Sequence, residues 1–210
     1  MVGAIFALQG RLAEQEESAG ALDLCLAAIE DAECWIGLAP GQSWPIERWA
    51  GLEEQAGIRM LELGRTEEGR ARVRRAAGIL EAIAARLRPH PARHADLVTT
   101  LANLSWYWLF AAEGQKAIDA ARAALTHDPT KIWIETNLAH GLLLVGDKEA
   151  ASAVYVARAD VLVDVGGGPV SFRDAVLKDF EAFRRARLVL PGMEEIEALL
   201  RDSAKKEGGG

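Results

Sequence analysis

Two asparagines separated by 34 residues are the polar side chains whose spacing points most clearly to a binding function. Asn103 and Asn137 each lie within a mostly apolar stretch. A carboxamide offers one acceptor and two donors, so it can bond both the C=O and the N–H of an extended peptide. Repeated at a constant interval, such groups would hold the main chain of a bound segment. The alternative is that each amide bonds a neighbouring helix and sets the helix spacing, because a buried amide must find partners in either case.

Further side chains share a helical face with the two asparagines. Steps of three and four residues place Thr99, Trp106 and Phe110 on the face of Asn103. Trp133 and Trp106 could anchor a bound segment, as aromatic side chains in grooves do. The corresponding position of an earlier helix is Gln55. The residues predicted to line a peptide-binding groove are Gln55, Thr99, Asn103, Trp106, Phe110, Trp133, Thr136, Asn137 and His140.

The sequence carries no recognisable pattern for catalysis or metal binding. No glycine-rich loop follows a strand, no His/Glu pair has zinc spacing, and Ser, His and Asp form no familiar constellation. The four histidines fall on different elements or turns: His90, His94, His127 and His140. We therefore expect no enzymatic activity, no cofactor and no metal site.

Composition indicates the class of protein. Half of the residues are hydrophobic, and the apolar positions recur at helical steps rather than alternating as in strands, which predicts an all-α fold. The formal net charge of −7 argues against a nucleic-acid partner. A run of four arginines between Arg70 and Arg75 is interpreted as a solvated helix face that answers Glu67 and Glu68.

The cysteines and the opening segment indicate the compartment. Cys25 and Cys34 lie nine residues apart in one predicted helix, so they point to opposite sides and cannot pair with each other. Unpaired thiols suit a reducing compartment. The opening stretch MVGAIFALQG is apolar but too short to span a bilayer. We expect a cytoplasmic protein with no membrane segment.

The elements that carry the asparagines form an internal repeat. At the same offset of 34, Leu104 corresponds to Leu138 and Ala117 to Ala151, with a helix–turn–helix in each unit. With the Asp128-Pro129 break between the units, this pattern resembles the tetratricopeptide (TPR) repeat family. The resemblance implies a right-handed superhelical stack of antiparallel helix hairpins whose first helices line a concave face. It also implies a scaffold that binds a peptide or protein partner on that face, and similar asparagine ladders occur in peptide-binding members.

The predicted organisation has three parts. Residues 1–165 form the TPR-like array, with two long hairpins followed by two regular repeats at about 92–127 and 131–160. Capping helices occupy 166–204, and 205–210 form a disordered tail. Glycines at the hairpin turns are expected in the left-handed conformation that commonly ends a helix. These turn glycines are Gly10, Gly64, Gly114 and Gly146.

Two other functions remain open on the sequence alone. The segments WIETNLAH and DAVLKDFEAFRRA, within 133–200, resemble the C-terminal block of bacterial multi-repeat proteins, some of which carry a caspase-like protease domain. The chain would then be a regulatory or assembly part of a larger bacterial effector. Alternatively, the first helix and the apolar C-terminal helices could pair between copies and form a homodimer.

Overall fold

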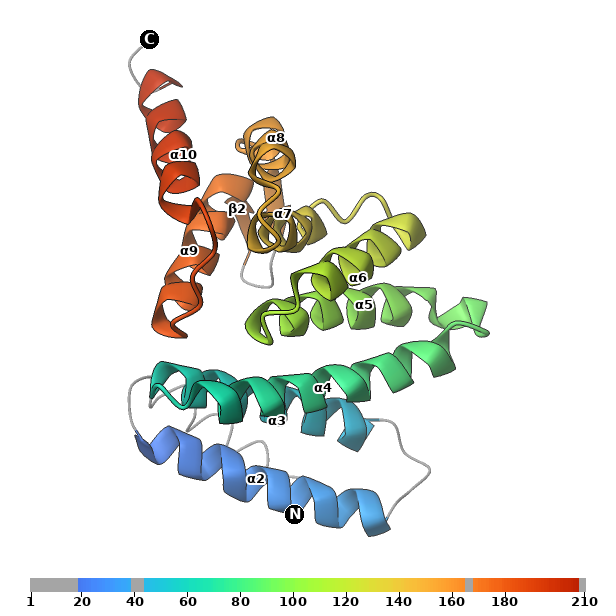
Figure 1. Cartoon of the computed structure of the whole chain (residues 1–210). Coiled ribbons are helices and arrows are strands. Elements are labelled where there is room, and N and C mark those ends of the chain that lie inside the picture. Colours follow the sequence, from blue (N-terminus) through green and yellow to red (C-terminus); the bar gives the residue numbers. More distant parts are fainter. Residues whose placement is uncertain (1–18, 39–43, 165–167, 208–210) are drawn as a thin grey trace.

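The computed structural model describes residues 19–38, 44–164 and 168–207, and this part of the chain is mostly helical (Figure 1). The all-α class expected from the sequence is therefore confirmed. The helices are α2 (Ala19–Leu38), α3 (Trp44–Glu62), α4 (Thr66–Leu87), the short 3-10 helix η1 (Pro91–Arg93), α5 (His94–Phe110), α6 (Gly114–His127), α7 (Ile134–Leu144), α8 (Lys148–Arg158), α9 (Phe172–Arg185) and α10 (Met193–Glu207).

Local sequence signals place most helix starts. Ser171 caps α9, accepting a hydrogen bond from the backbone N–H of Asp174 at 3.0 Å, as the Ser-x-x-Asp pattern predicts. The start of α7 is later than expected. The Asp128 carboxylate accepts hydrogen bonds from the backbone N–H of Thr130 at 3.0 Å and from its hydroxyl at 2.5 Å. This turn delays the helix to Ile134.

Each helix from α2 to α8 packs against its neighbour in chain order, and α5 also contacts α7. Figure 1 shows these helices following one another from α2 to α8. One large apolar core extends from α3 to α10, while α2 forms a second, smaller core against α3. The helices that carry the predicted groove residues, α5 and α7, are thus direct neighbours.

Glycines let two pairs of helices approach very closely. A Cβ added at Gly57 of α3 would lie 2.8 Å from the carbonyl oxygen of Gly69, and one added at Gly69 of α4 would lie 2.7 Å from that of Gly57. Gly114 of α6 and Gly141 of α7 face each other in the same reciprocal way, at 3.3 Å in each direction. No larger side chain fits at the first crossing unless the helices separate.

The hairpin turns use a left-handed residue, but not always glycine. Gly64 and Gly146 have φ of +81° and +87°, as expected. In the turn between α5 and α6, Ala112 takes this conformation with φ of +60°. The expectation that Gly114 is the left-handed residue of this turn is therefore wrong: Gly114 begins α6 and is needed for its approach to α7. Gly10 lies outside the described residues.

Replacing Ala112 by glycine should raise the free energy of unfolding by about 1 kcal/mol, because the left-handed conformation costs a residue with a Cβ roughly that amount. Urea unfolding followed by circular dichroism measures the change. Ala71→Gly, at an exposed position inside α4, should instead lower stability by about 1 kcal/mol. A loss of stability in Ala112→Gly would contradict the assignment of this turn.

The arginines between Arg70 and Arg75 in α4 form ion pairs with neighbouring helices as well as facing solvent. Arg72 Nη1 lies 2.8 Å from Glu53 Oε2, and Arg75 Nη1 lies 3.3 Å from Glu53 Oε1. Arg75 also reaches Glu33 of α2 at 2.7 Å. Glu53 is fully buried, so its two arginines compensate a carboxylate that water cannot solvate. Of the expected partners, Glu67 does face Arg70, at 3.9 Å.

A short β-hairpin that the sequence did not reveal connects α8 to α9. Strands β1 (Leu162–Asp164) and β2 (Pro169–Ser171) pair antiparallel, with Val163 opposite Val170. Each strand is too short to produce a periodic signal. Residues 165–167 of the expected glycine joint lie outside the described residues. Residues 205–207, which were expected to begin a disordered tail, belong to α10, and residues 208–210 lie outside the described residues.

Within the described residues, no helix is long and apolar enough to cross a membrane. The Cys25 side chain is buried between α2 and α3, and burial raises the pKa of its thiol to about 11. The side chain of Cys34 lies outside the described residues.

Candidate functional site

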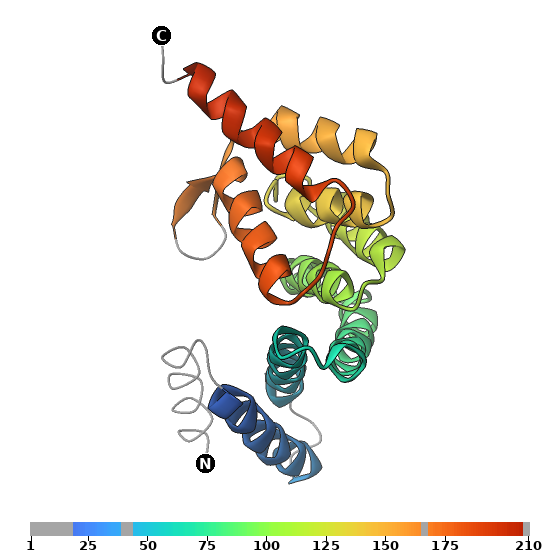
Figure 2. The same ribbon diagram turned by 60° about the vertical axis from the view of Figure 1, so that its left-hand side comes forward.

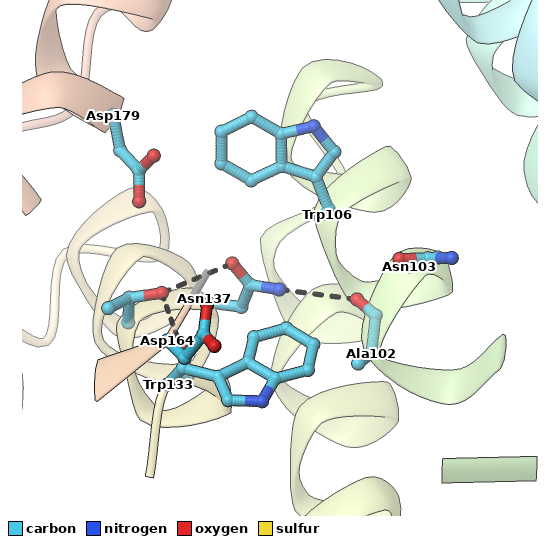
Figure 3. A pocket seen from close by; sticks show the side chains of 8 residues that line it. Ala102, Asn103, Trp106, Trp133, Asn137, Asp164 and Asp179 are labelled. Atoms are coloured by element: carbon cyan, nitrogen blue, oxygen red, sulfur yellow. Dashed lines mark hydrogen bonds between the residues drawn. The ribbon is translucent and has the colours of Figure 1, made fainter. Parts of the chain in front are cut away.

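A pocket of about 350 Å³ lies where α5, α7, β1 and α9 meet (Figure 3). Five of the nine predicted groove residues line it. Its lining residues are Ala102, Asn103, Trp106, Trp133, Thr136, Asn137, Asp164 and Asp179. The 34-residue repeat thus brings the two asparagines to one site, as the spacing predicts.

Two tryptophans form the walls of this pocket. Figure 3 shows the Trp106 ring and the Trp133 ring on opposite sides of Asn137. The Trp106 ring packs against Phe110 and Phe183, with centroid distances of 4.9 and 5.5 Å. Both indoles are partly exposed, so each keeps an apolar surface for a ligand.

Asn137 already uses its amide nitrogen within the protein. The side chain is 5% exposed, and its Nδ2 donates to Ser105 Oγ at 2.8 Å and to the carbonyl oxygen of Ala102 at 3.2 Å. These bonds join α7 to α5. Asn137 therefore helps to set the spacing between two helices, which is the alternative role that the sequence left open. The Oδ1 atom is less engaged. Thr136 Oγ1 lies 3.5 Å from it, but the single proton of that hydroxyl is donated to the carbonyl oxygen of Trp133 at 2.8 Å.

Asn103 has a different environment from Asn137. It is exposed at the rim of the pocket, and its amide points away from Asn137 in Figure 3. The two residues therefore share a pocket without being equivalent rungs of a ladder. Only Asn103 presents both its donor and its acceptor groups to solvent.

Asp179 enters the pocket from α9 and is oriented by a buried histidine. His140 Nε2 lies 3.1 Å from Asp179 Oδ2, and His140 Nδ1 lies 2.8 Å from the hydroxyl of Tyr155. A carboxylate only accepts hydrogen bonds, so in the neutral imidazole Nε2 donates to Asp179 and the phenol donates to Nδ1. Burial, together with the nearby charge of Asp179, raises the pKa of Tyr155 well above its usual value, so this phenol keeps its proton.

Helix α9 covers part of the surface where an open groove was expected. Its Phe183 ring lies 5.3 Å from Phe110 and 5.0 Å from His140, measured between centroids. Phe110 is 1% exposed and His140 is fully buried, so neither lines the pocket. Figure 2 shows α9 beside the helices that precede it. The segment expected only to cap the array thus packs its aromatic residues on the pocket side of α5 and α7.

The two remaining predicted residues do not line the pocket. Thr99 is exposed, and its hydroxyl donates to the carbonyl oxygen of Ala95 at 3.1 Å. Gln55 is exposed on α3. The neighbour of Gln55 matters more to the site: the mostly buried Glu54 accepts a hydrogen bond from the indole N–H of Trp106. Burial raises the pKa of Glu54 to about 7, and the Trp106 hydrogen bond partly opposes that rise.

Both carboxylates of the pocket were missed by the sequence analysis. Asp164 ends β1 and Asp179 lies in α9, so neither belongs to the repeat that related the asparagines. The only sequence signal near Asp179 is the amphipathic stripe of α9, which places Phe180 and Phe183 in the core. Among the described residues, no group of three or more His, Cys, Asp or Glu side chains could hold a metal ion.

Comparisons with protein-family models, with curated proteins and with solved structures found no significant match to this chain. The site is therefore interpreted from its own geometry.

Proposed function

We propose that the chain is a non-catalytic protein-interaction scaffold, built as a TPR-like stack of helix hairpins, that binds a segment of a partner protein in the pocket between α5 and α7. The observation that carries the proposal is the pocket itself. Its volume of about 350 Å³ lies in the range of ligand sites, and two partly exposed indoles line it on opposite sides of Asn137. Aromatic side chains that become buried when a partner binds contribute much of the affinity of many protein interfaces.

The TPR-like part of the proposal is supported by the geometry of the turns. Ala112 and Gly146, the left-handed residues of two successive hairpins, lie 34 positions apart, the same interval as Asn103 and Asn137. Each is followed two residues later by the first residue of the next helix, Gly114 or Lys148. The hairpins α5–α6 and α7–α8 therefore have the same turn geometry at the same interval, which supports a common repeat unit.

The polar groups suggest how a segment would be held. A side chain of the partner would enter between Trp106 and Trp133. The exposed Asn103 amide can then bond the main chain of the segment with both its donor and its acceptor. Asn137 contributes its Oδ1 only, because its nitrogen is committed to α5. The site thus offers both the donor and the acceptor of Asn103 but only the acceptor of Asn137. The sequence had predicted two equivalent amides.

The test begins with a selection of random twelve-residue peptides displayed on phage against the immobilised full chain. Selected peptides are then synthesised and titrated by fluorescence anisotropy. Trp133→Ala should weaken binding at least tenfold, since anchor residues contribute about 2 kcal/mol or more. Asn103→Ala should weaken binding about fivefold without changing stability, because its amide is exposed. Gln115→Ala, which removes an exposed amide from α6, is the matched control and should change nothing.

Asn137→Ala should behave differently from Asn103→Ala. It removes two buried hydrogen bonds between α7 and α5, so we expect a loss of about 1–2 kcal/mol in the free energy of unfolding as well as weaker binding. Peptides whose affinities are unchanged by both Trp133→Ala and Asn103→Ala would bind elsewhere, and this result would refute the proposed site.

A further inference from the structure

Trp106 connects the pocket to a buried carboxyl group. Its ring lines the pocket, while its indole nitrogen lies on the edge of the ring away from Asn137 and Trp133 (Figure 3). The indole N–H donates a hydrogen bond to Glu54 of α3. Glu54 itself does not line the pocket. One rigid side chain therefore joins the surface that a partner segment would contact to a group that can gain or lose a proton.

The ionisable neighbours of Glu54 keep one charge state near neutral pH. Burial raises the pKa of Tyr107 in α5 above its usual value, and the charge of Glu54 raises it further. Burial raises the pKa of Cys25 in α2 to about 11, with further effects of Arg59 and Glu54. The arginines that α4 directs toward α3 pair with Glu53. Within this cluster of described residues, Glu54 is thus the group whose charge changes between about pH 5 and pH 9.

The charge of Glu54 determines how firmly Trp106 is held. Burial raises the pKa of Glu54 to about 7, so its carboxyl group is mostly neutral at pH 5.5 and mostly ionised at pH 8.5. A hydrogen bond to a carboxylate is about twice as strong as one to a neutral acceptor. The ionised form therefore holds the indole more firmly than the neutral form does. The hydrogen bond from Trp106 accordingly lowers the pKa of Glu54 and opposes part of the effect of burial.

The cost of burying the charge does not decide the effect on binding. Burial destabilises the ionised form of the folded protein, but it does so equally with and without a ligand, because Glu54 lies outside the pocket lining. The hydrogen bond does not cancel in this way. A ligand that packs on the Trp106 ring loses less affinity to ordering that ring when a carboxylate already holds it in position. By linkage, binding of the ligand then lowers the pKa of Glu54.

We propose that Glu54 regulates the pocket through Trp106, so that a partner segment binds more tightly when the Glu54 carboxyl group is ionised. This inference rests on the proposed function and adds its regulation by pH. Glu54 is a positioning residue, because it contacts the ring that lines the pocket and does not line the pocket itself. The affinity for a partner segment therefore rises as the pH increases through the range in which Glu54 loses its proton.

The experiment uses the full chain and peptides from the phage selection. The chosen peptides contain no histidine or cysteine and are acetylated at the N-terminus, so their charge is constant near pH 7. Anisotropy titrations between pH 5.5 and pH 8.5 should give about three- to fivefold tighter binding at the higher pH, with a midpoint near 7. This change corresponds to a pKa of Glu54 that is lower by about half a unit in the complex. Circular dichroism verifies at each pH that the protein is folded.

Two variants interrupt the connection in different ways. Glu54→Gln keeps an acceptor for the indole N–H but cannot ionise, so its affinity should be the same at pH 5.5 and pH 8.5. Trp106→Phe keeps an aromatic wall but has no N–H to donate, and the ratio of its two affinities should also fall to about one. Glu47→Gln removes an exposed carboxylate from the same helix and should retain the pH dependence of the wild type. The ionisable side chains Asp179 and His140 are present in every variant, so their contribution cancels in the comparison.

A second measurement needs no ligand. In protein labelled with ¹⁵N at tryptophan, the indole N–H resonance of Trp106 is the one that Trp106→Phe lacks. Its chemical shift should change with pH around a midpoint near 7 in the wild type, and this change should be absent in Glu54→Gln. A Trp106 resonance that responds identically in both proteins would overturn the inference, whatever the peptides show.

The outcomes separate the two proposals. If selected peptides lose affinity in Trp133→Ala but bind equally well at pH 5.5 and pH 8.5, the regulatory inference is overturned and the proposed function stands. The same holds if the pH dependence persists in Glu54→Gln, or if binding is tighter at the lower pH. If no peptide is selected, or Trp133→Ala and Asn103→Ala have no effect, both are overturned. A purely structural role of Glu54 would change stability in Glu54→Gln without changing the ratio of the two affinities.

Discussion

Gly69→Ala should lower the free energy of unfolding by about 2 kcal/mol. The added methyl group would lie 2.7 Å from the carbonyl oxygen of Gly57 and 2.8 Å from Leu61 Cγ. A backbone oxygen cannot rotate away, so α3 and α4 must separate and lose packing along their shared core. Overpacking typically costs about 1–3 kcal/mol. The better helix propensity of alanine returns about 1 kcal/mol of the loss, so the packing strain itself lies at the upper end of that range.

Helix α4 supplies its own control for this prediction. Gly78 is exposed in the same helix, and an added Cβ there would meet nothing within 4 Å. Gly78→Ala should therefore raise stability by about 1 kcal/mol through helix propensity alone. Urea unfolding curves of the two variants give the opposite signs directly. Two variants of equal stability would mean that α3 and α4 do not cross as closely as described.

Glu54→Gln should be more stable than the wild type at pH 8 by at most about 3 kcal/mol, and no more stable at pH 4. Burial raises the pKa of this carboxyl group from 4.5 to about 7 in the folded protein. The folded state therefore binds the proton more tightly than the unfolded state does. The resulting stabilisation is complete below pH 4.5 and is lost as the pH rises through 7. Each pKa unit corresponds to about 1.4 kcal/mol, which sets the upper limit.

Glutamine suits this experiment because its side-chain oxygen can still accept the indole N–H of Trp106. Free energies of unfolding are measured by urea titration at several pH values between 4 and 8. The difference between variant and wild type isolates Glu54 from the other titrating groups. Glu47→Gln, which removes an exposed carboxylate from the same helix, controls for the change in net charge. A difference that is constant across this pH range would contradict the raised pKa.

Features set by neighbouring residues could be predicted from the sequence. The starts of α4, α6 and α8 follow from the turns before them, and the cap at Ser171 follows from a four-residue pattern. The meeting of Asn103, Trp106, Trp133 and Asn137 at one pocket follows from the 34-residue period, because equal positions in adjacent hairpins lie side by side.

The different environments of the two asparagines depend on a single neighbouring position. Asn137 finds a hydroxyl on the preceding first helix, at Ser105, two residues after Asn103. The position two residues after Gln55 is Gly57, which has no side chain to offer Asn103. Periodicity relates the backbones of the repeats, but it does not determine which of two equivalent amides becomes buried.

The pocket's carboxylates and the burial of Phe110 and His140 could not be predicted for another reason. They depend on where α9 packs after the β-hairpin, and nothing in the repeat specifies that placement. The contact between His140 and Asp179 spans 39 residues and joins a repeat helix to a helix outside the repeat. Only the three-dimensional path of the chain brings them together.

The position of α9 limits how this protein could change in length during evolution. Arrays of helical hairpins commonly grow or shrink by duplication or loss of whole units, since each unit touches only the next. In this chain Phe183 contacts both Trp106 of one hairpin and His140 of the following one. An extra hairpin inserted between them would pull these two contacts apart. A hairpin added on the N-terminal side of α5 would leave both contacts intact, so the helices from α5 to α8 form with α9 a unit whose internal spacing is fixed.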